Sequence, residues 1–120
     1  MIVRHTSEMH IEDRHQMRGG TGTVTVKDLF SPEEMLGHGR LFAENVVPPG
    51  ASVGLHPHEG DTEWCYIVSG QGTYLYNDER HDVAAGDLTV VGDGHRHGIE
   101  NTGDEPLLFI ALILFTGGDR

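Results

Sequence analysis

The stretch that decides the fold is GASVGLHPHEGDTEWCYIVSG, which runs from Gly50 to Gly70. His56 and His58 lie two residues apart at the end of a β-prone run, so both side chains point to one face of a strand. A short polar turn follows, and it would fold the carboxylate of Glu63 back beside the two imidazoles. The stretch therefore predicts two consecutive strands, with three possible metal ligands near the turn between them.

A second stretch, GDLTVVGDGHRHGIEN from Gly86 to Asn101, supplies a fourth imidazole on His97. A site of three histidines and one carboxylate suits Mn(II), Fe(II), Ni(II), Cu(II) or Zn(II). It suits calcium poorly, because calcium prefers oxygen ligands. Spacing alone leaves a second interpretation open, in which the His-x-His pair is only a polar strand end.

The rest of the chain indicates an all-β fold. Seventeen glycines are spread between short β-prone runs, a pattern typical of a sandwich or barrel. One helical turn is predicted at Ser31–Leu36, where Ser31 caps, Pro32 takes the first position and Glu34 closes a capping box. The expected strands are Thr21–Lys27, Leu41–Val47, Ser52–Leu55, Glu63–Val68, Gly72–Tyr76, Arg80–Val83, Leu88–Val91, Gly98–Asn101 and Leu107–Leu114.

Length and organisation favour one domain. The 120 residues contain no linker and no low-complexity tract, so we expect a single domain over 1–120. Its N-terminal extension covers about residues 1–20, and the motifs lie within 50–101.

Composition excludes several partners. The net charge of -11 opposes binding to phosphate backbones and to anionic membrane surfaces. No apolar run is long enough to cross a bilayer as a helix. Cys65 is the only cysteine, so no intramolecular disulfide can form. We therefore expect a cytoplasmic protein that binds neither nucleic acid nor membranes.

The last expected strand, Leu107–Leu114, is apolar on both faces. One face of such a strand would point into a barrel, and the other must be covered by another layer. The segment that carries Ile2 and Val3 is one candidate cover, and a second subunit is the other. We expect a homodimer built through outer sheet faces.

The two stretches resemble the two motifs of the cupin superfamily. The first motif is Gly, five residues, His-x-His, four residues, Glu, six residues, Gly. The matching positions are Gly50, His56, His58, Glu63 and Gly70. The second motif is matched by Gly86, Gly94, His97 and Asn101, and it departs from the family only at Gly92, where the motif has proline.

The resemblance implies a double-stranded β-helix, a jelly-roll barrel of two packed antiparallel sheets. It assigns one divalent transition metal per chain, manganese first, to His56, His58, Glu63 and His97. Short single-domain bacterial cupins are commonly homodimers, which agrees with the apolar last strand.

The resemblance leaves two functions open. The first is a metal-dependent enzyme (an oxidoreductase, lyase or isomerase) that acts on a small oxygenated carboxylate or a sugar-like substrate. The alternative is a non-catalytic module that binds or senses a small ligand through the same metal. Oxalate is the first substrate to consider, but oxalate decarboxylases of the family typically carry an arginine three residues before the first motif histidine. Val53 stands there in this chain, so decarboxylation would need Arg18 or Arg40 instead.

Several other side chains have competing roles. Cys65 would face inward by alternation from Glu63, either lining the cavity or filling the core. His95 is a partner of the metal site or a surface residue. Surface roles are preferred for Arg18 and Arg40, core packing for Tyr74, Tyr76 and Phe42, and turn stabilisation for Asn101.

Overall fold

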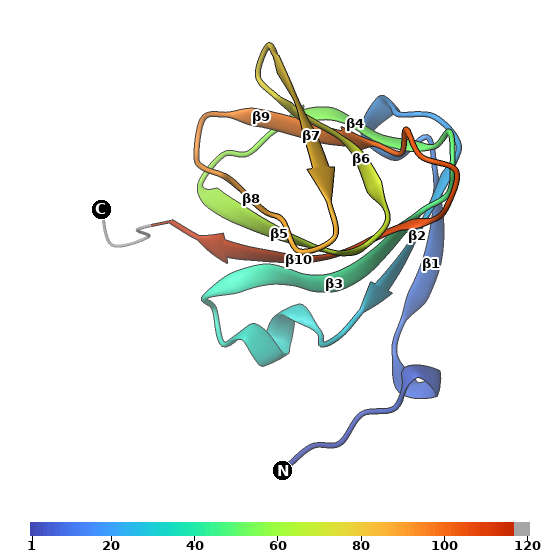
Figure 1. The fold of residues 1–120 in the computed structure, drawn as a ribbon. Helices are drawn as coiled ribbons and strands as arrows, with labels where there is room; N and C mark the ends of the chain where they lie inside the picture. Colours follow the sequence, from blue (N-terminus) through green and yellow to red (C-terminus); the bar gives the residue numbers. More distant parts are fainter. Residues whose placement is uncertain (117–120) are drawn as a thin grey trace.

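Two antiparallel sheets face each other in the computed structural model, which describes residues 1–116 (Figure 1). The larger sheet has the order β1-β2-β3-β10-β5-β8, and the smaller has the order β4-β9-β6-β7. The strands are β1 (Ile11–His15), β2 (Thr23–Asp28), β3 (Gly39–Val47), β4 (Ser52–Pro57), β5 (Asp61–Ser69), β6 (Gln71–Tyr76), β7 (Glu79–Ala84), β8 (Leu88–Val91), β9 (Arg96–Glu100) and β10 (Leu107–Phe115).

The chain crosses between the sheets after β3, β4, β5, β7, β8 and β9, so most sheet neighbours are distant in sequence. In the larger sheet, β10 pairs with both β3 and β5, and in the smaller sheet β9 pairs with β4 and β6. This is the predicted double-stranded β-helix, a jelly-roll barrel of two packed antiparallel sheets.

Alternation along the strands builds the core. In β5, Cys65 and Ile67 are buried, whereas Tyr66 and Val68 are exposed, as the sequence predicted. In β10, Leu107, Phe109, Ala111 and Ile113 are buried in the same way. Alternate residues of these two strands therefore fill the space between the sheets.

All nine expected strands are present, but the sequence missed β1. The segment IEDRH of β1 has a single aliphatic residue, and it forms the edge of the larger sheet by pairing with β2. Backbone hydrogen bonds rather than apolar burial hold such a strand, so the sequence carries little signal for it. The expected N-terminal extension thus contributes a strand to the barrel.

Three short 3₁₀ helices complete the described chain: η1 (Thr6–Glu8), η2 (Met17–Gly19) and η3 (Pro32–Met35). The predicted turn corresponds to η3, where the Ser31 backbone N–H donates to the Glu34 carboxylate at 2.9 Å in a capping box. No helix within residues 1–116 is long and apolar enough to span a membrane.

The N-terminal segment does not cover the outer face of β10. The side chains of Ile2 and Val3 are 69% and 64% exposed. Arg4 instead ties the segment to the region around η3, through an ion pair with Glu34 at 2.8 Å and a hydrogen bond to the Leu29 carbonyl. In Figure 1 the chain before β1 extends away from the barrel, so this suggested cover is wrong.

Candidate metal centre

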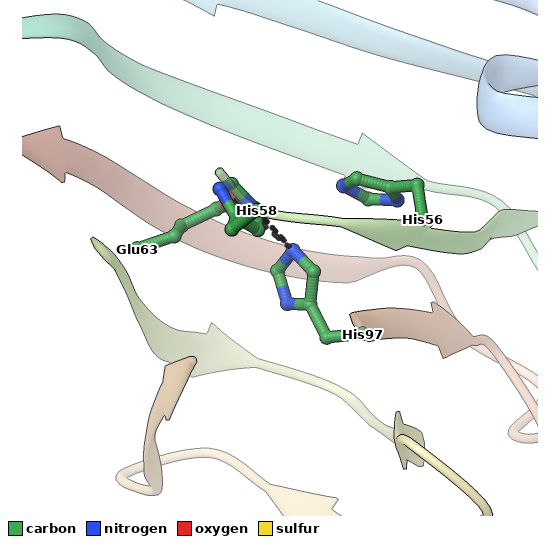
Figure 2. A group of neighbouring side chains, drawn as sticks. All are labelled: His56, His58, Glu63 and His97. Atoms are coloured by element: carbon green, nitrogen blue, oxygen red, sulfur yellow. Dashed lines mark hydrogen bonds and ion pairs between the residues drawn. The ribbon is translucent and has the colours of Figure 1, made fainter. Parts of the chain in front are cut away.

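Three strands bring the four predicted ligands together between the two sheets (Figure 2). His56 lies on β4 and is in register with His97 on β9. His58 follows directly after β4, and Glu63 lies on β5 of the opposite sheet. One ligand atom from each of the four residues lies within 4.8 Å of the others. The cluster is therefore able to hold a metal ion.

The separations within the cluster match those around a single ion. His58 Nε2 lies 2.8 Å from Glu63 Oε1, and His97 Nε2 lies 3.1 Å from the same oxygen. The two Nε2 atoms are 3.0 Å apart. Adjacent ligands of an octahedral ion, with bonds of about 2.1 Å, are separated by about 3.0 Å. Three of the four side chains thus already have the spacing of neighbouring ligands.

Each imidazole is anchored through its Nδ1 atom, which leaves Nε2 for the cluster. His56 Nδ1 donates to the Gly54 carbonyl at 2.7 Å, and His58 Nδ1 donates to the Asp61 carboxylate at 2.6 Å. For His97, the Tyr74 hydroxyl lies 2.9 Å from Nδ1 and can accept from it. Such outer partners fix the ring orientation and the tautomer that a metal requires.

Burial and mutual contacts set the charges of the cluster. Burial would raise the pKa of Glu63, but hydrogen bonds with His58 and His97 lower it overall, so this carboxylate is ionised. The hydrogen bond to Glu63 raises the pKa of His58 despite the cost of burial. Burial lowers the pKa of His56 to about 4, which keeps that imidazole neutral near pH 7. The cluster therefore offers the ionised carboxylate of Glu63 to a cation.

Asp61 and Arg40 form an outer chain that sequence reasoning did not identify. Asp61 is 4% exposed and bridges His58 to Arg40, whose Nε donates at 2.8 Å. Burial opposes ionisation of Asp61, but the contacts with Arg40 and His58 lower its pKa overall. The His-x-x-Asp spacing was the available sequence signal for the contact between His58 and Asp61. Arg40 lies 21 residues from Asp61 in the sequence, so only the folded chain brings these two residues together. Arg40 is therefore more than the surface residue that the sequence suggested.

A cavity of about 280 Å³ opens beside the ligands. Both Cys65 and Tyr74 line it, so Cys65 fills the core and also faces the cavity. The Cys65 thiol donates to Glu63 Oε2 at 3.2 Å, and burial raises the pKa of this thiol. Val53, the residue in the place of the family arginine, also lines the cavity. Arg14, Arg18, Arg40, Asp28 and Asn45 are among its polar lining residues.

Other candidates lie outside the cavity. His95 is exposed, stacks on Tyr76 and contacts the side chain of Asn77, so it is a surface residue. Phe42 packs against Phe30. The Asn101 side chain bonds the carbonyls of Val47 and Glu105 and the N–H of Gly103, which confirms its role in a turn.

Comparisons with known proteins agree with this architecture. An oxalate-binding protein of Thermotoga maritima is 45% identical over 114 residues, which cover 95% of this chain and 93% of that protein. The crystal structure of a predicted oxalate decarboxylase from Thermotoga maritima matches with a TM-score of 0.90 at 44% identity, covering 96% of this chain and 99% of the other.

A third relative is larger. An oxalate decarboxylase of Bacillus subtilis is 37% identical over 71 residues, which are 55% of this chain but 18% of that enzyme. The model of the cupin domain family matches residues 44–113, more than half of the chain and all four clustered residues. The fold, the cluster and this match lead to one conclusion: the chain belongs to the cupin family.

Proposed function

We propose that this protein holds one divalent transition metal ion on His56, His58, Glu63 and His97, and that it binds a small carboxylate such as oxalate there. The observation that carries the proposal is the convergence of the clustered side chains, with each Nδ1 held from outside. Three imidazoles and one carboxylate suit manganese, our first candidate, and also iron, nickel, copper or zinc.

The protein would leave room beside the metal for a ligand. Four protein ligands leave two positions of an octahedral ion open, and a bound ion would act as a Lewis acid toward carboxylate oxygens. The cavity of about 280 Å³ suits a small molecule, and residues such as Val53 and Phe109 limit water around it. The similarity to an oxalate-binding protein supports oxalate as the first ligand to test.

Turnover of the bound carboxylate, or of a sugar-like substrate, is the second candidate function. The carboxyl groups that line the cavity belong to Glu63 and Asp28, and Glu63 is a member of the ligand cluster. Asp28 is therefore the candidate for proton transfer in an enzyme. Binding without turnover is the first candidate, because the relative that is 45% identical over 95% of this chain is an oxalate-binding protein.

Elemental analysis and calorimetry test these alternatives. Protein purified without chelator should contain about one Mn, Fe, Ni, Cu or Zn ion per chain, and His58→Ala should lose it. His81→Ala is the matched control, since His81 is exposed and pairs with Glu79. Manganese-loaded protein should bind oxalate with one-to-one stoichiometry and leave it intact over hours. Steady loss of oxalate would favour the enzyme, and a wild-type protein that binds none of the five ions would refute the proposal.

We also propose that the chain is a homodimer. The outer face of the larger sheet carries Tyr66, Val68, Leu88 and Val90, each at least 42% exposed, beside half-buried side chains of β10. Tyr66 is in register with Leu88 on one side and with Ile110 on the other, so this surface is continuous across three strands. A second copy would remove it from water.

Two proposals remain from the sequence. The net charge of -11 supports a protein without nucleic-acid partners, and the single buried thiol of Cys65 supports a cytoplasmic location. Fractionation of cells and a binding assay with DNA and RNA test these proposals.

A further inference from the structure

The walls of the cavity carry a local excess of positive charge on an acidic protein. Three arginines, Arg14, Arg18 and Arg40, line the cavity against the two carboxylates of Asp28 and Glu63, although the chain has a net charge of -11. An anion that approaches such a protein is repelled unless the entrance is locally positive. The distribution of charge therefore favours an anionic ligand.

Two of the three guanidinium groups already have partners. Arg14 forms an ion pair with Glu12, and Arg40 forms one with Asp61. Within residues 1–116, Arg18 forms no ion pair and no side-chain hydrogen bond. Arg18 nevertheless lines the same cavity as the four clustered residues. Arg18 is thus an exposed cation that lines the cavity and has no ion-pair partner within residues 1–116.

The backbone around Arg18 is held in an unusual conformation. Gln16 and Arg18 have φ angles of 52° and 56°, in the left-handed region that side chains rarely adopt. Strain of this kind persists only where the surrounding structure enforces it, and it concentrates at sites that clamp ligands. The position of Arg18 is therefore imposed by its neighbours.

Tight packing against β4 enforces this position. A Cβ atom at Gly54 would clash with the Arg18 carbonyl oxygen, and a Cβ atom at Gly20 would clash with the Ser52 carbonyl oxygen. Gly54 also accepts the Nδ1 hydrogen bond of His56. One segment of β4 therefore positions both a metal ligand and the loop that carries Arg18.

We propose that Arg18 binds the anionic group of the ligand that points away from the metal. This inference rests on the proposed function. A guanidinium presents a planar fork of donors that matches a carboxylate, and it keeps its charge at every physiological pH. The ligand class would then be small dicarboxylates, with one carboxylate at the metal and the other at Arg18. A monocarboxylate would bind the metal without this second contact.

Calorimetry with manganese-loaded Arg18→Gln tests the inference. Its affinity for oxalate should fall about tenfold to a hundredfold, the range for loss of a charged hydrogen bond. Its affinity for manganese and for acetate should stay at the wild-type level. Arg80→Gln is the matched control, because Arg80 is exposed, pairs with Glu100 and lies outside the cavity. Arg18→Lys should recover part of the lost affinity, since it restores charge without the fork.

The outcomes separate this inference from the proposed function. If the wild-type protein binds manganese and oxalate, and Arg18→Gln binds oxalate with the same affinity, the role of Arg18 is overturned and the proposed function stands. An equal loss of acetate and oxalate binding in Arg18→Gln also overturns it, because the second carboxylate would then have no part. Failure of the wild-type protein to bind manganese or oxalate overturns both.

Discussion

Asp61 shows how a single residue can control the cluster without belonging to it. It accepts from His58 Nδ1 and from Arg40 Nε, so it holds the imidazole in the orientation that directs Nε2 at Glu63. Asp61→Asn would replace a charged acceptor by an amide. We expect manganese affinity to fall about tenfold to a hundredfold.

Metal competition titration checks this prediction. The control is Asp78→Asn, since the Asp78 side chain is 97% exposed. Unchanged metal affinity in Asp61→Asn would show that His58 is oriented without its acceptor.

The proton on His58 predicts how metal binding depends on pH. The metal-free pKa of His58 is raised above 6.5 by its hydrogen bond with Glu63. This proton stabilises the metal-free protein fully below pH 6.5, and the contribution is lost as the pH rises through the raised pKa. A metal needs the unprotonated Nε2, so its affinity should rise over the same window.

Thermal unfolding measures this effect. The gain in Tm on adding manganese should be small near pH 5.5 and should grow toward about pH 8. His56 adds little to this trend, because its pKa of about 4 lies below the window. A gain in Tm that is the same throughout the range would contradict a proton at His58 that competes with the metal.

At the scale of elements, the close contact between the η2 loop and β4 depends on Gly54, which has no side chain. Gly54 has no room for a Cβ atom beside the Arg18 carbonyl, whereas a Cβ atom at Gly92 would meet no atom within 4 Å. We expect Gly54→Ala to lower the free energy of unfolding by about 1–3 kcal/mol through overpacking. Gly92→Ala should change it by less than about 0.5 kcal/mol.

Urea unfolding of the two variants checks this pair. If Gly54→Ala and Gly92→Ala have equal free energies of unfolding, the η2 loop can move away from β4 without loss of stability, and the prediction is wrong. The comparison also examines the place where this chain has Gly92 instead of the proline of the second cupin motif.

At the scale of the whole molecule, the proposed homodimer would bury the outer face of the larger sheet. A Tyr66→Glu, Leu88→Glu double variant would place two charges on the proposed interface, where burial of unpaired charge is costly. Light scattering should give twice the 13.2 kDa chain mass for the wild type and a single chain mass for the variant.

A substitution on the other sheet serves as the control. His81→Glu lies on β7, outside this surface, and should remain a dimer. A monomeric wild type at micromolar concentration would refute the homodimer. The expectation of a single domain over 1–120 has its own test, a single cooperative unfolding transition.

The sequence by itself determined what depends on local pattern. Alternation predicted which side of β5 faces inward, and the spacing of His56, His58 and Glu63 predicted three clustered side chains, because strand geometry and a short turn are local. The polar strand β1 was missed because backbone pairing with β2 leaves no apolar pattern.

Only the tertiary structure decided which distant residues support the cluster. Arg40 reaches Asp61, Tyr74 reaches His97, and the η2 loop packs against β4, each across at least 21 positions of sequence. These contacts follow from the order of strands in the two sheets, which pairs segments far apart in the chain. Local periodicity fixes the face on which a side chain lies, whereas the pairing of strands fixes what it meets there.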